Sequence, residues 1–338
     1  MDDRPVIAIT IGDPAGVGPE VVLKALTRPH LLEICTPLVI GDAGLLDLAA
    51  SRLKLPADLA RISSLDQIDS PSQSALVFHV PGVDLGTFRP GSLAAEYGQA
   101  SLDYLNCAID FALDSKVAAI ATGPINKAAL HLAGSPYRGH TQLLADRCRV
   151  ERVSMMLLSP GRLPEPHWLR VTHATTHIAL HEVPSRLTLE GLISTIQLTQ
   201  ESLLRLGIKA PRLAVAGLNP HAGDEGVMGD EEIRWIQPTV MQCRTEGIDV
   251  SGPFPADTVF LRAVQGEFDA VVALYHDQGH IAVKMHGFEN AVNLTIGLPI
   301  IRTSVDHGTA FDIAWQGKAN EASMVSAIEL AAEFATNP

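Results

Sequence analysis

Short runs of β-branched residues alternate with glycine-containing turns and helical segments, and this alternation constrains the fold of the chain most strongly. The first run covers 5–11, and the turn 12–20 (Gly-Asp-Pro-Ala-Gly-Val-Gly-Pro-Glu) leads into a helical segment at 21–26. The same unit recurs from 37–40 and from 117–121. Because strands that alternate with helices form right-handed βαβ crossovers, the pattern predicts an α/β fold with a largely parallel sheet.

A second series of strands follows the turn at 134–136. Long helical patterns at 187–206 and 231–246 separate several of these strands, and a last helix is predicted at 323–334. A chain of 338 residues exceeds one average domain, so we expect two α/β domains that share a cleft. The strands of the second series are predicted at 154–158, 169–172, 213–217, 270–274 and 291–294.

Composition narrows the class of protein further. The chain is 46% hydrophobic and 19% charged, with 27 glycines and 22 prolines, as in a compact α/β enzyme with many tight turns. A net charge of −13 without a cluster of Lys and Arg argues against a nucleic-acid partner. The four cysteines form no CxxC pair, which argues against disulfides and a thiolate zinc site and favours a reducing cytosol.

The start of the chain lacks the features of a secretory signal, which are a basic region followed by an apolar one. No apolar run approaches the roughly 20 residues that span a bilayer. We therefore expect a cytoplasmic protein without a membrane partner.

Three histidines directly follow apolar strands of the predicted sheet. His177 ends Ala-Thr-Thr-His, His221 lies in Gly-Leu-Asn-Pro-His-Ala-Gly, and His276 lies in Ala-Leu-Tyr-His-Asp-Gln-Gly-His. Open α/β sheets place their ligand sites at the carboxyl ends of strands. A single histidine of this kind is more often a hydrogen-bonded loop residue, but three at equivalent strand ends favour a catalytic site for Zn²⁺ or a related divalent ion.

Two further histidines, His173 and His280, lie four residues from His177 and His276. The segment around His173 is β-branched and is predicted to be strand, where four residues span about 13 Å, so both members of that pair cannot bind one ion. The same restriction is applied to His276 and His280. Spacing alone leaves open which member of each pair is a ligand.

The first turn contains Gly12, Gly16 and Gly18. Glycines permit backbone N–H groups to approach an anionic group at the start of the following helix. Their spacing is not the G-x-G-x-x-G dinucleotide fingerprint, so any nicotinamide cofactor would bind in a non-Rossmann manner. A tight structural turn is the equally good alternative.

Near the carboxyl end, residues 306–314 (Asp-His-Gly-Thr-Ala-Phe-Asp-Ile-Ala) are predicted to run from a loop into a helix, and 317–320 (Gly-Lys-Ala-Asn) follow. The polar groups around Gly308 are candidates to contact an adenosine. The alternative is an ordinary helix start.

Several charged residues are candidate anion contacts. Lys284 follows the apolar run 281–283 and Arg302 follows the apolar run 298–301, which suggests strand-end positions near the cleft. Arg138 is a third candidate. A solvated side chain is the ordinary alternative for each of them.

Three other polar side chains are candidates for the site. Asn293 is a possible substrate contact. Asp257, in Phe-Pro-Ala-Asp-Thr-Val-Phe, and Asp277, next to His276, are candidates for a general base or for the orientation of a metal ligand. Either aspartate is also suited to cap a turn.

Eight ordered segments make the chain resemble the 4-hydroxythreonine-4-phosphate dehydrogenase family of the vitamin B6 pathway over nearly its whole length. They are the turn 12–20, Thr-Gly-Pro-Ile-Asn-Lys at 122–127, Gly-His-Thr at 139–141, Ala-Thr-Thr-His at 174–177, Gly-Leu-Asn-Pro-His-Ala-Gly at 217–223, Pro-Ala-Asp-Thr at 255–258, Tyr-His-Asp-Gln-Gly at 275–279 and Arg-Thr-Ser-Val-Asp-His-Gly-Thr-Ala at 302–310.

The resemblance implies a fold and a domain organisation. The first and last of these segments are similar to the isocitrate and isopropylmalate dehydrogenase fold, a two-domain α/β fold without a Rossmann fingerprint. In that fold the two chain ends form one domain. The resemblance therefore implies a cofactor-side domain at 1–132 plus 305–338, and a domain for metal, substrate and dimerisation at 133–304.

The same resemblance implies roles for individual residues. It selects His177, His221 and His276 as ligands of one divalent ion per subunit (Zn, Mg or Co). It implies a homodimer whose active site draws on both subunits. Substrate contacts are implied for His140, Thr141, Lys284, Asn293 and Arg302, catalytic roles for Asp257, Lys284 and Asp277, and NAD or NADP contacts for Gly12, Asp13, His307, Gly308, Thr309, Ala310, Asp312 and Asn320.

The implied reaction is the oxidation of 4-phosphohydroxy-L-threonine to 2-amino-3-oxo-4-phosphobutanoate, which loses carbon dioxide to give 3-amino-2-oxopropyl phosphate. Segments 275–281 and 310–315 are more similar to the branch that acts on erythronate or threonate 4-phosphate, with dihydroxyacetone phosphate as product. A third branch acts on dihydrodiol dicarboxylates, but the set His140, Lys284 and Arg302 argues against it.

Two alternative hypotheses from other classes of protein remain. A three-histidine zinc hydrolase would use the same ligands to activate water and would leave 307–310 unexplained. A non-catalytic phosphate-binding module would leave the histidines unexplained.

Overall fold

The computed structural model describes residues 4–56, 59–68, 74–161 and 168–336, and its chain forms two compact units. Unit 1 contains the residues up to Glu151 together with Leu298–Thr336, and unit 2 contains Arg152–Gly297. The ends of the expected cofactor-side domain, 1–3 and 337–338, lie outside the described residues.

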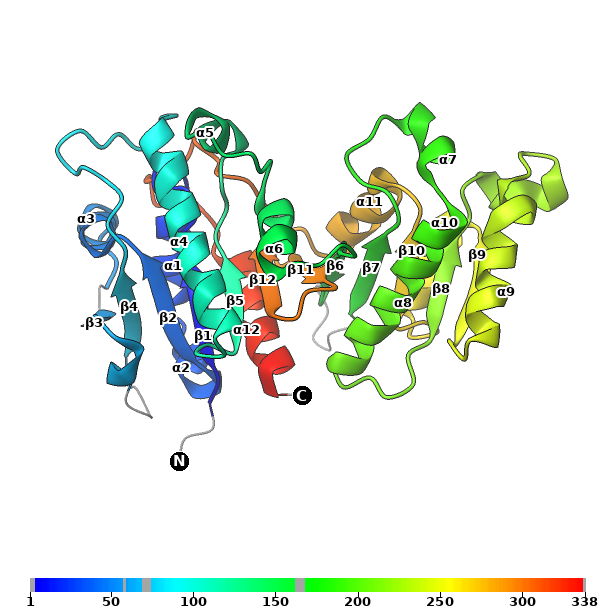
Figure 1. Ribbon diagram of the computed structural model, residues 1–338, viewed down its shortest axis with the longest axis horizontal. Coiled ribbons are helices and arrows are strands. Elements are labelled where there is room, and N and C mark those ends of the chain that lie inside the picture. Colours follow the sequence, from blue (N-terminus) through cyan, green and yellow to red (C-terminus); the bar gives the residue numbers. More distant parts are fainter. Residues whose placement is uncertain (1–3, 57–58, 69–73, 162–167, 337–338) are drawn as a thin grey trace. The chain divides into compact units, whose positions relative to one another are not determined.

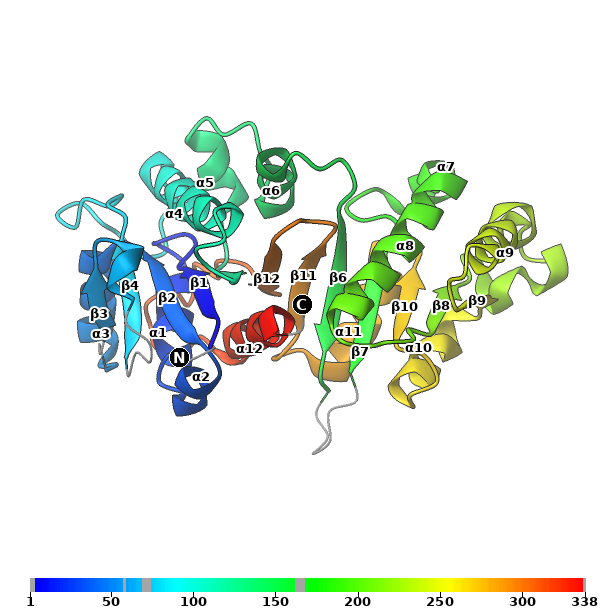
Figure 2. The ribbon, with the colours of Figure 1, turned by 60° about the horizontal axis from the view of Figure 1, so that its bottom comes forward.

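Unit 1 is built on a parallel sheet with the strand order β3-β4-β2-β1-β5-β12. Figure 2 shows helix α4 on one face of this sheet and helix α12 on the other. The strands are β1 (Val6–Thr10), β2 (Thr36–Gly41), β3 (Leu59–Ile62), β4 (Ala75–His79), β5 (Ala119–Thr122) and β12 (Ile301–Val305). The helices are α1 (Gly18–Ala25), α2 (Pro29–Ile34), α3 (Ala43–Leu53), α4 (Ala95–Leu113), α5 (Lys127–Leu132), α6 (His140–Cys148) and α12 (Ala322–Thr336).

Unit 2 has the strand order β11-β6-β7-β10-β8-β9. Strand β6 runs antiparallel to both of its neighbours, and the pairs from β7 to β9 are parallel. The strands are β6 (Ser154–Ser159), β7 (Leu169–His173), β8 (Leu213–Ala216), β9 (Val250–Phe254), β10 (Ala270–Ala273) and β11 (Val292–Ile296). The helices are α7 (Val183–Arg186), α8 (Leu189–Arg205), α9 (Gln237–Thr245), α10 (Ala256–Val264) and α11 (His276–Gly287), and a π-helix covers Glu232–Ile236.

In the core of unit 2, every second side chain of a strand points to the same face of the sheet and packs against the helices that cover it. Val171 of β7, Val271 of β10 and Ala214 of β8 point to the same face, where they pack against Val259 of α10 and Val283 of α11. Helix α8, whose apolar stripe is buried, lies on the opposite face (Figure 2). The result is a three-layer α/β arrangement, which confirms the predicted fold class.

The helices predicted at 187–206 and 323–334 correspond to α8 and α12, and the strands of the predicted βαβ units are present (Figure 1). The sheet of unit 2 is mixed because β6 enters it in the opposite direction. The other strand pairs within both units are parallel, so the sheets are largely parallel as predicted. One local prediction was wrong. Residues 306–314 do not enter a helix, since the backbone turns to positive φ at Ala310 and Trp315 and α12 begins only at Ala322.

The boundary of the first unit also differs from the expected one. Residues 133–151 were expected in the second domain, whereas the structure places them in unit 1. The reason is helix α6, whose Arg147 donates hydrogen bonds to Asn106 and Asp110 of α4. Among the described residues, no helix combines the length and the apolarity that crossing a membrane requires.

Candidate functional site

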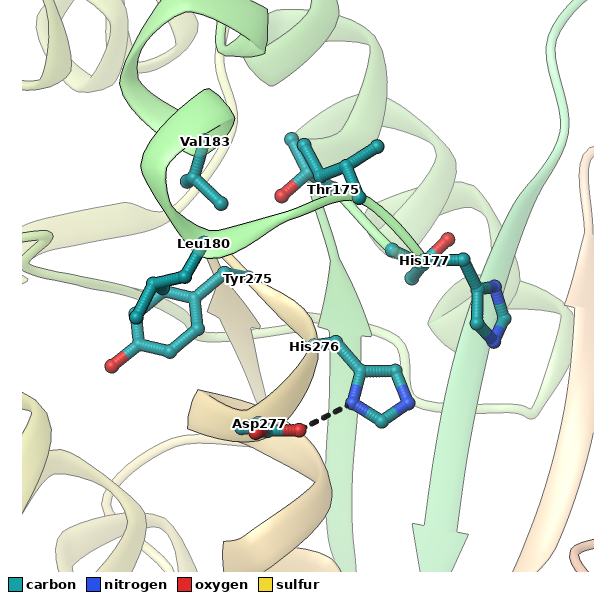
Figure 3. A pocket seen from close by; sticks show the side chains of 9 residues that line it. Thr175, His177, Leu180, Val183, Tyr275, His276 and Asp277 are labelled. Carbon is teal, nitrogen blue, oxygen red and sulfur yellow. Dashed lines mark hydrogen bonds and ion pairs between the residues drawn. The ribbon is translucent and has the colours of Figure 1, made fainter.

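His177 and His276 line the same hollow in unit 2, which has a volume of about 280 Å³. His177 lies in the loop after β7, and His276 is the first residue of α11, three positions after β10 ends. Because β7 and β10 are parallel neighbours, their carboxyl ends lie side by side. Figure 3 shows both imidazoles on the same side of the hollow. Thr175, Leu180, Val183 and Tyr275 contribute to the rest of its wall.

The two imidazoles fit a divalent metal ion. Their ring centroids are 5.4 Å apart, a separation that two ligands of one ion can adopt. Nδ1 of His276 is hydrogen bonded to Oδ1 of Asp277 at 2.6 Å (Figure 3). A carboxylate in this place holds Nδ1–H and leaves Nε2 for a metal, which is the arrangement found behind many histidine ligands.

His173 and His280 lie in the interior instead, with exposed fractions of 3% and 8%. Nδ1 of His280 is 3.1 Å from Nε2 of His173 and 3.0 Å from the carbonyl oxygen of His276. Burial, together with the neighbouring His280 and His276, lowers the pKa of His173 to about 3, so this imidazole is neutral. Neither histidine lines the hollow.

One assumption about spacing was wrong for His276 and His280. The strand restriction applies to His173, at the end of β7, but His276 and His280 lie on the first turns of α11. Residues four apart on a helix are neighbours, and these two rings stack with centroids 3.6 Å apart.

His221 does not line this hollow. It follows β8 in an exposed turn with a φ of +54°. Within the described parts of the chain, no group of three or more His, Cys, Asp or Glu side chains has a metal-binding arrangement. One chain therefore brings His177 and His276 together but does not add His221.

The other predicted residues of unit 2 lie on different elements. Asp257 is exposed in the first turn of α10. Lys284 is on α11 rather than at a strand end, because the apolar residues before it belong to the helix, and its Nζ lies 5.1 Å from the ring centroid of Phe288. Asn293 is in β11, opposite Leu157 of β6.

Arg302 is the most deeply buried cation among the predicted residues of unit 1. It lies inside β12 and not at its end, its exposed fraction is 2%, and its guanidinium donates to Oγ1 of Thr122 at 2.6 Å. Burial lowers the pKa of Arg302 to about 9. Burial and the charge of Arg302 hold the pKa of His140 well below its usual value.

His140 and Thr141 begin helix α6, and Nε2 of His140 is a buried atom without a hydrogen-bond partner among the described residues. The region around Arg302 therefore combines a buried positive charge with an unused imidazole nitrogen, which suits an anionic group such as a phosphate. Thr122, which accepts the hydrogen bond from Arg302, was not predicted as a site residue. Its position directly after the predicted strand 117–121 could have indicated it.

The first turn, 12–20, is in contact with the segment around Thr309 in unit 1. Val17 N–H donates to the carbonyl oxygen of Thr309 at 2.9 Å, and a Cβ on Gly16 would lie 2.9 Å from Cβ of Thr309. Gly12 has a φ of +68°, and a Cβ there would lie 2.2 Å from the carbonyl oxygen of Pro124. The structure thus brings the predicted cofactor residues Gly12, Asp13, His307, Gly308, Thr309 and Ala310 into one region of unit 1.

The last two predicted cofactor residues have different settings. Asp312 is exposed, and its backbone oxygen accepts a hydrogen bond from Gln316. Asn320 accepts from the N–H of Ala322, the first residue of α12, at 2.9 Å. Its side-chain oxygen is therefore already engaged in the turn that leads into the helix.

The comparisons with known proteins agree with this architecture. Residues 33–331 match the family of the pyridoxal phosphate biosynthetic protein PdxA. The chain is 46% identical to a 4-hydroxythreonine-4-phosphate dehydrogenase of Desulforapulum autotrophicum (99% of this chain, 97% of the relative). It is 45% identical to a D-threonate 4-phosphate dehydrogenase of Cupriavidus necator (99% and 98%).

A crystal structure of a 4-hydroxythreonine-4-phosphate dehydrogenase from Klebsiella pneumoniae superimposes with a TM-score of 0.88 at 43% identity, over 98% of this chain and all of the other. Sequence and fold agree over nearly the full length. The chain therefore belongs to the family of the pyridoxal phosphate biosynthetic protein PdxA.

Proposed function

We propose that the chain is a metal-dependent, nicotinamide-linked dehydrogenase that oxidises 4-phosphohydroxy-L-threonine at its secondary hydroxyl. Family membership makes it an oxidoreductase. The product, 2-amino-3-oxo-4-phosphobutanoate, is a β-keto acid, and it loses carbon dioxide to give 3-amino-2-oxopropyl phosphate. The observation that carries the proposal is the pair His177 and His276 in one hollow, with Asp277 behind His276.

A second substrate has support of its own. Relatives named D-threonate 4-phosphate dehydrogenase match almost as well as those named for 4-hydroxythreonine 4-phosphate, with 45% against 46% identity. Erythronate or threonate 4-phosphate would undergo the same oxidation and loss of carbon dioxide, and the product would be dihydroxyacetone phosphate. The substrates differ at carbon two, where one carries an amino group and the other a hydroxyl.

His177, His221 and His276 are the proposed metal ligands. A divalent ion (Zn, Mg or Co) held by them supplies positive charge that makes the substrate hydroxyl more acidic. Asp277 keeps His276 in the tautomer whose Nε2 faces the hollow. Asp257 or Lys284 is the proposed base that accepts the hydroxyl proton.

The substrate and the dinucleotide have separate proposed contacts. In unit 1, Arg302, His140 and Thr141 offer an anion site for the phosphate. In unit 2, Lys284 and Asn293 are the proposed polar contacts. NAD or NADP would be held by 307–310 and the first turn, and it would accept the hydride that the substrate loses. Both ligands are compounds of the cytoplasm, where we expect the enzyme to act.

We further propose a homodimer whose metal site receives ligands from both subunits. Two ligands of the three lie together in one chain, and His221 does not. Helix α11, which begins with His276, carries an exposed apolar stripe at Ile281 (62%), Met285 (78%) and Phe288 (61%). A stripe of this kind next to a metal ligand suits a subunit interface.

The test is a spectrophotometric assay of the purified protein with NAD⁺ or NADP⁺, a divalent ion and each of the three four-carbon 4-phosphates. We expect reduced nicotinamide and one carbon dioxide per turnover, loss of both after chelation, and loss of at least ~100-fold in rate in His276→Ala. Leu204→Ala, an exposed change on α8 in the same unit, is the control.

Failure to reduce a bound cofactor with any of these acids would contradict the dehydrogenase proposal. Metal-dependent hydrolysis without nicotinamide would instead favour the zinc hydrolase.

A further inference from the structure

The loop that carries His221 has an uncommon backbone. Six consecutive residues, 221–226, have positive φ, at +54°, +55°, +84°, +43°, +54° and +95°, and four of them are not glycine. Left-handed backbone is costly for residues with a Cβ, so it persists only where the surroundings impose it. The residues are His221, Ala222, Gly223, Asp224, Glu225 and Gly226.

Glu232 holds the start of this loop and packs against its turn. Its exposed fraction is 1%, and its Oε1 accepts the backbone N–H groups of Leu218 and Asn219 at 2.7 and 2.8 Å. Its Oε2 accepts from Nδ2 of Asn219 at 2.9 Å. A Cβ on Gly223 would lie 2.8 Å from the same oxygen, so the turn wraps closely around the carboxylate. Glu232 begins the π-helix, an element that is frequent at functional sites.

Gln278 connects this loop to the helix that carries His276. Its side chain is buried, Oε1 accepts the N–H of Leu274 at 2.7 Å, and Nε2 donates to the carbonyl oxygen of Gly217 at 2.7 Å. Leu274 follows β10 and precedes His276, whereas Gly217 follows β8 and precedes His221. One amide therefore links the strand ends that lead to two different histidines.

We propose that Gln278 and Glu232 are positioning residues, which hold the His221 loop at a fixed place relative to His276. The inference rests on the proposed metal site. Gln278 fixes the start of the loop against α11, and Glu232 fixes its left-handed turn. Together they keep His221 in the orientation in which it is offered to the metal ion, so that binding does not have to order the loop.

The chemistry of the two side chains explains why these residue types are needed. An amide both accepts and donates, as Leu274 N–H and the Gly217 carbonyl require. Glutamate has the same shape but has no hydrogen to donate, so Gln278→Glu removes the bond to Gly217. A glutamine at 232 offers one oxygen to the two backbone donors, and its NH₂ group then faces the NH₂ group of Asn219.

The experiment measures Zn²⁺ affinity of the full-length protein by competition with a chromophoric chelator, and the visible spectrum of the Co²⁺ form. We expect Gln278→Glu and Glu232→Gln to weaken Zn²⁺ binding by about 10- to 100-fold and to alter the Co²⁺ bands. Gln237→Glu and Glu201→Gln make the same chemical changes at exposed sites of unit 2 and should bind like the wild type.

Two comparisons separate the possible failures. If His221→Ala and His276→Ala bind Zn²⁺ like the wild type, the proposed metal site is wrong, and this inference is wrong with it. If the histidine variants lose binding but both positioning variants retain wild-type affinity and spectrum, only the positioning role is wrong.

Loss of stability is controlled with Val259→Ala, a buried change in α10. If this variant lowers the unfolding midpoint equally and alters the Co²⁺ bands in the same way, general destabilisation explains the effect and the inference is overturned. If its bands stay unchanged, the effect belongs to Gln278 and Glu232.

Discussion

Asp13 is a buried acid, and only one of its two carboxylate oxygens has a hydrogen-bond partner among the described residues. Its exposed fraction is 0%, and Oδ1 accepts the N–H of Ala15 at 2.9 Å. Oδ2 has no hydrogen-bond partner among the described residues. Burial raises the pKa of Asp13 from 3.8 to about 6, although the N–H groups of Ala15 and Gly16 act in the opposite direction. The folded protein therefore holds this proton more tightly than the unfolded chain does.

Because the pKa of Asp13 is higher in the folded state, the free energy of unfolding depends on pH in a defined direction. The contribution of Asp13 to stability is fully present below its unfolded pKa and is lost as pH rises through about 6, because the folded state must then bury a charge. A rise from 3.8 to about 6 corresponds to about 3 kcal/mol. We expect Asp13→Asn to gain up to that amount relative to the wild type between about pH 4 and about pH 8, measured by urea unfolding without ligands. A stability difference that is the same at both pH values would contradict this prediction.

Arg302 gives a second prediction at the level of one residue. Arg302→Lys keeps the charge but replaces a planar fork of donors by a single ammonium group, so two-point contact with a phosphate is lost. We expect the KM for the phosphorylated substrate to rise at least ~10-fold and the KM for the dinucleotide to stay unchanged, measured by steady-state kinetics. Arg28→Lys, at an exposed ion pair of unit 1, is the matched control. Equal KM values for all three proteins would rule out the anion-site role.

At the scale of elements, helix α1 holds the segment that precedes α12. Glu20 is fully buried and accepts the N–H groups of Gly317 and Ala319 at 3.1 and 2.8 Å. Lys24, one turn later, donates to Glu20 and to the carbonyl oxygens of the same two residues. This network fixes residues 317–319 in the irregular segment that leads to α12.

Glu20→Gln tests the network. The change removes the charge and forces one NH₂ group against a backbone donor, so we expect a loss of about 1–3 kcal/mol in local stability. Hydrogen exchange at the amides of 317–319 should become faster by about 10-fold or more, and the KM for the dinucleotide should rise. Glu96→Gln, an exposed change in the first turn of α4, is the control. Unchanged exchange rates would show that Lys24 alone holds the segment.

Helix α4 shows why an element can escape prediction. Its start at Ala94 has no side-chain cap, and Gly98 interrupts its apolar pattern. A glycine in a helix usually weakens it. Here a Cβ on Gly98 would lie 2.1 Å from the carbonyl oxygen of Ala129, so the glycine permits close contact with α5. The sequence gives no sign of that neighbour.

At the scale of the whole molecule, the proposed homodimer makes activity depend on association. Met285→Glu places a charge in the apolar stripe of α11, and we expect the dimer to dissociate at least ~10-fold more readily and activity per chain to fall at low concentration. Sedimentation velocity at several concentrations measures the association. Met241→Glu, at another exposed methionine, on α9, should remain dimeric. Full activity from a monomeric Met285→Glu protein would contradict a shared site.

The sequence by itself determined the α/β class, most strands and the helices with a regular apolar period, because these depend on patterns a few residues long. It also identified the histidines at strand ends. Only tertiary structure decided that β6 runs antiparallel and that His173 and His280 are buried while His177 and His276 share a hollow. Tertiary structure alone also showed that Gln278 bonds to Gly217, 61 residues earlier in the chain. These features depend on contacts between distant residues, and the local pattern of side chains carries no information about them.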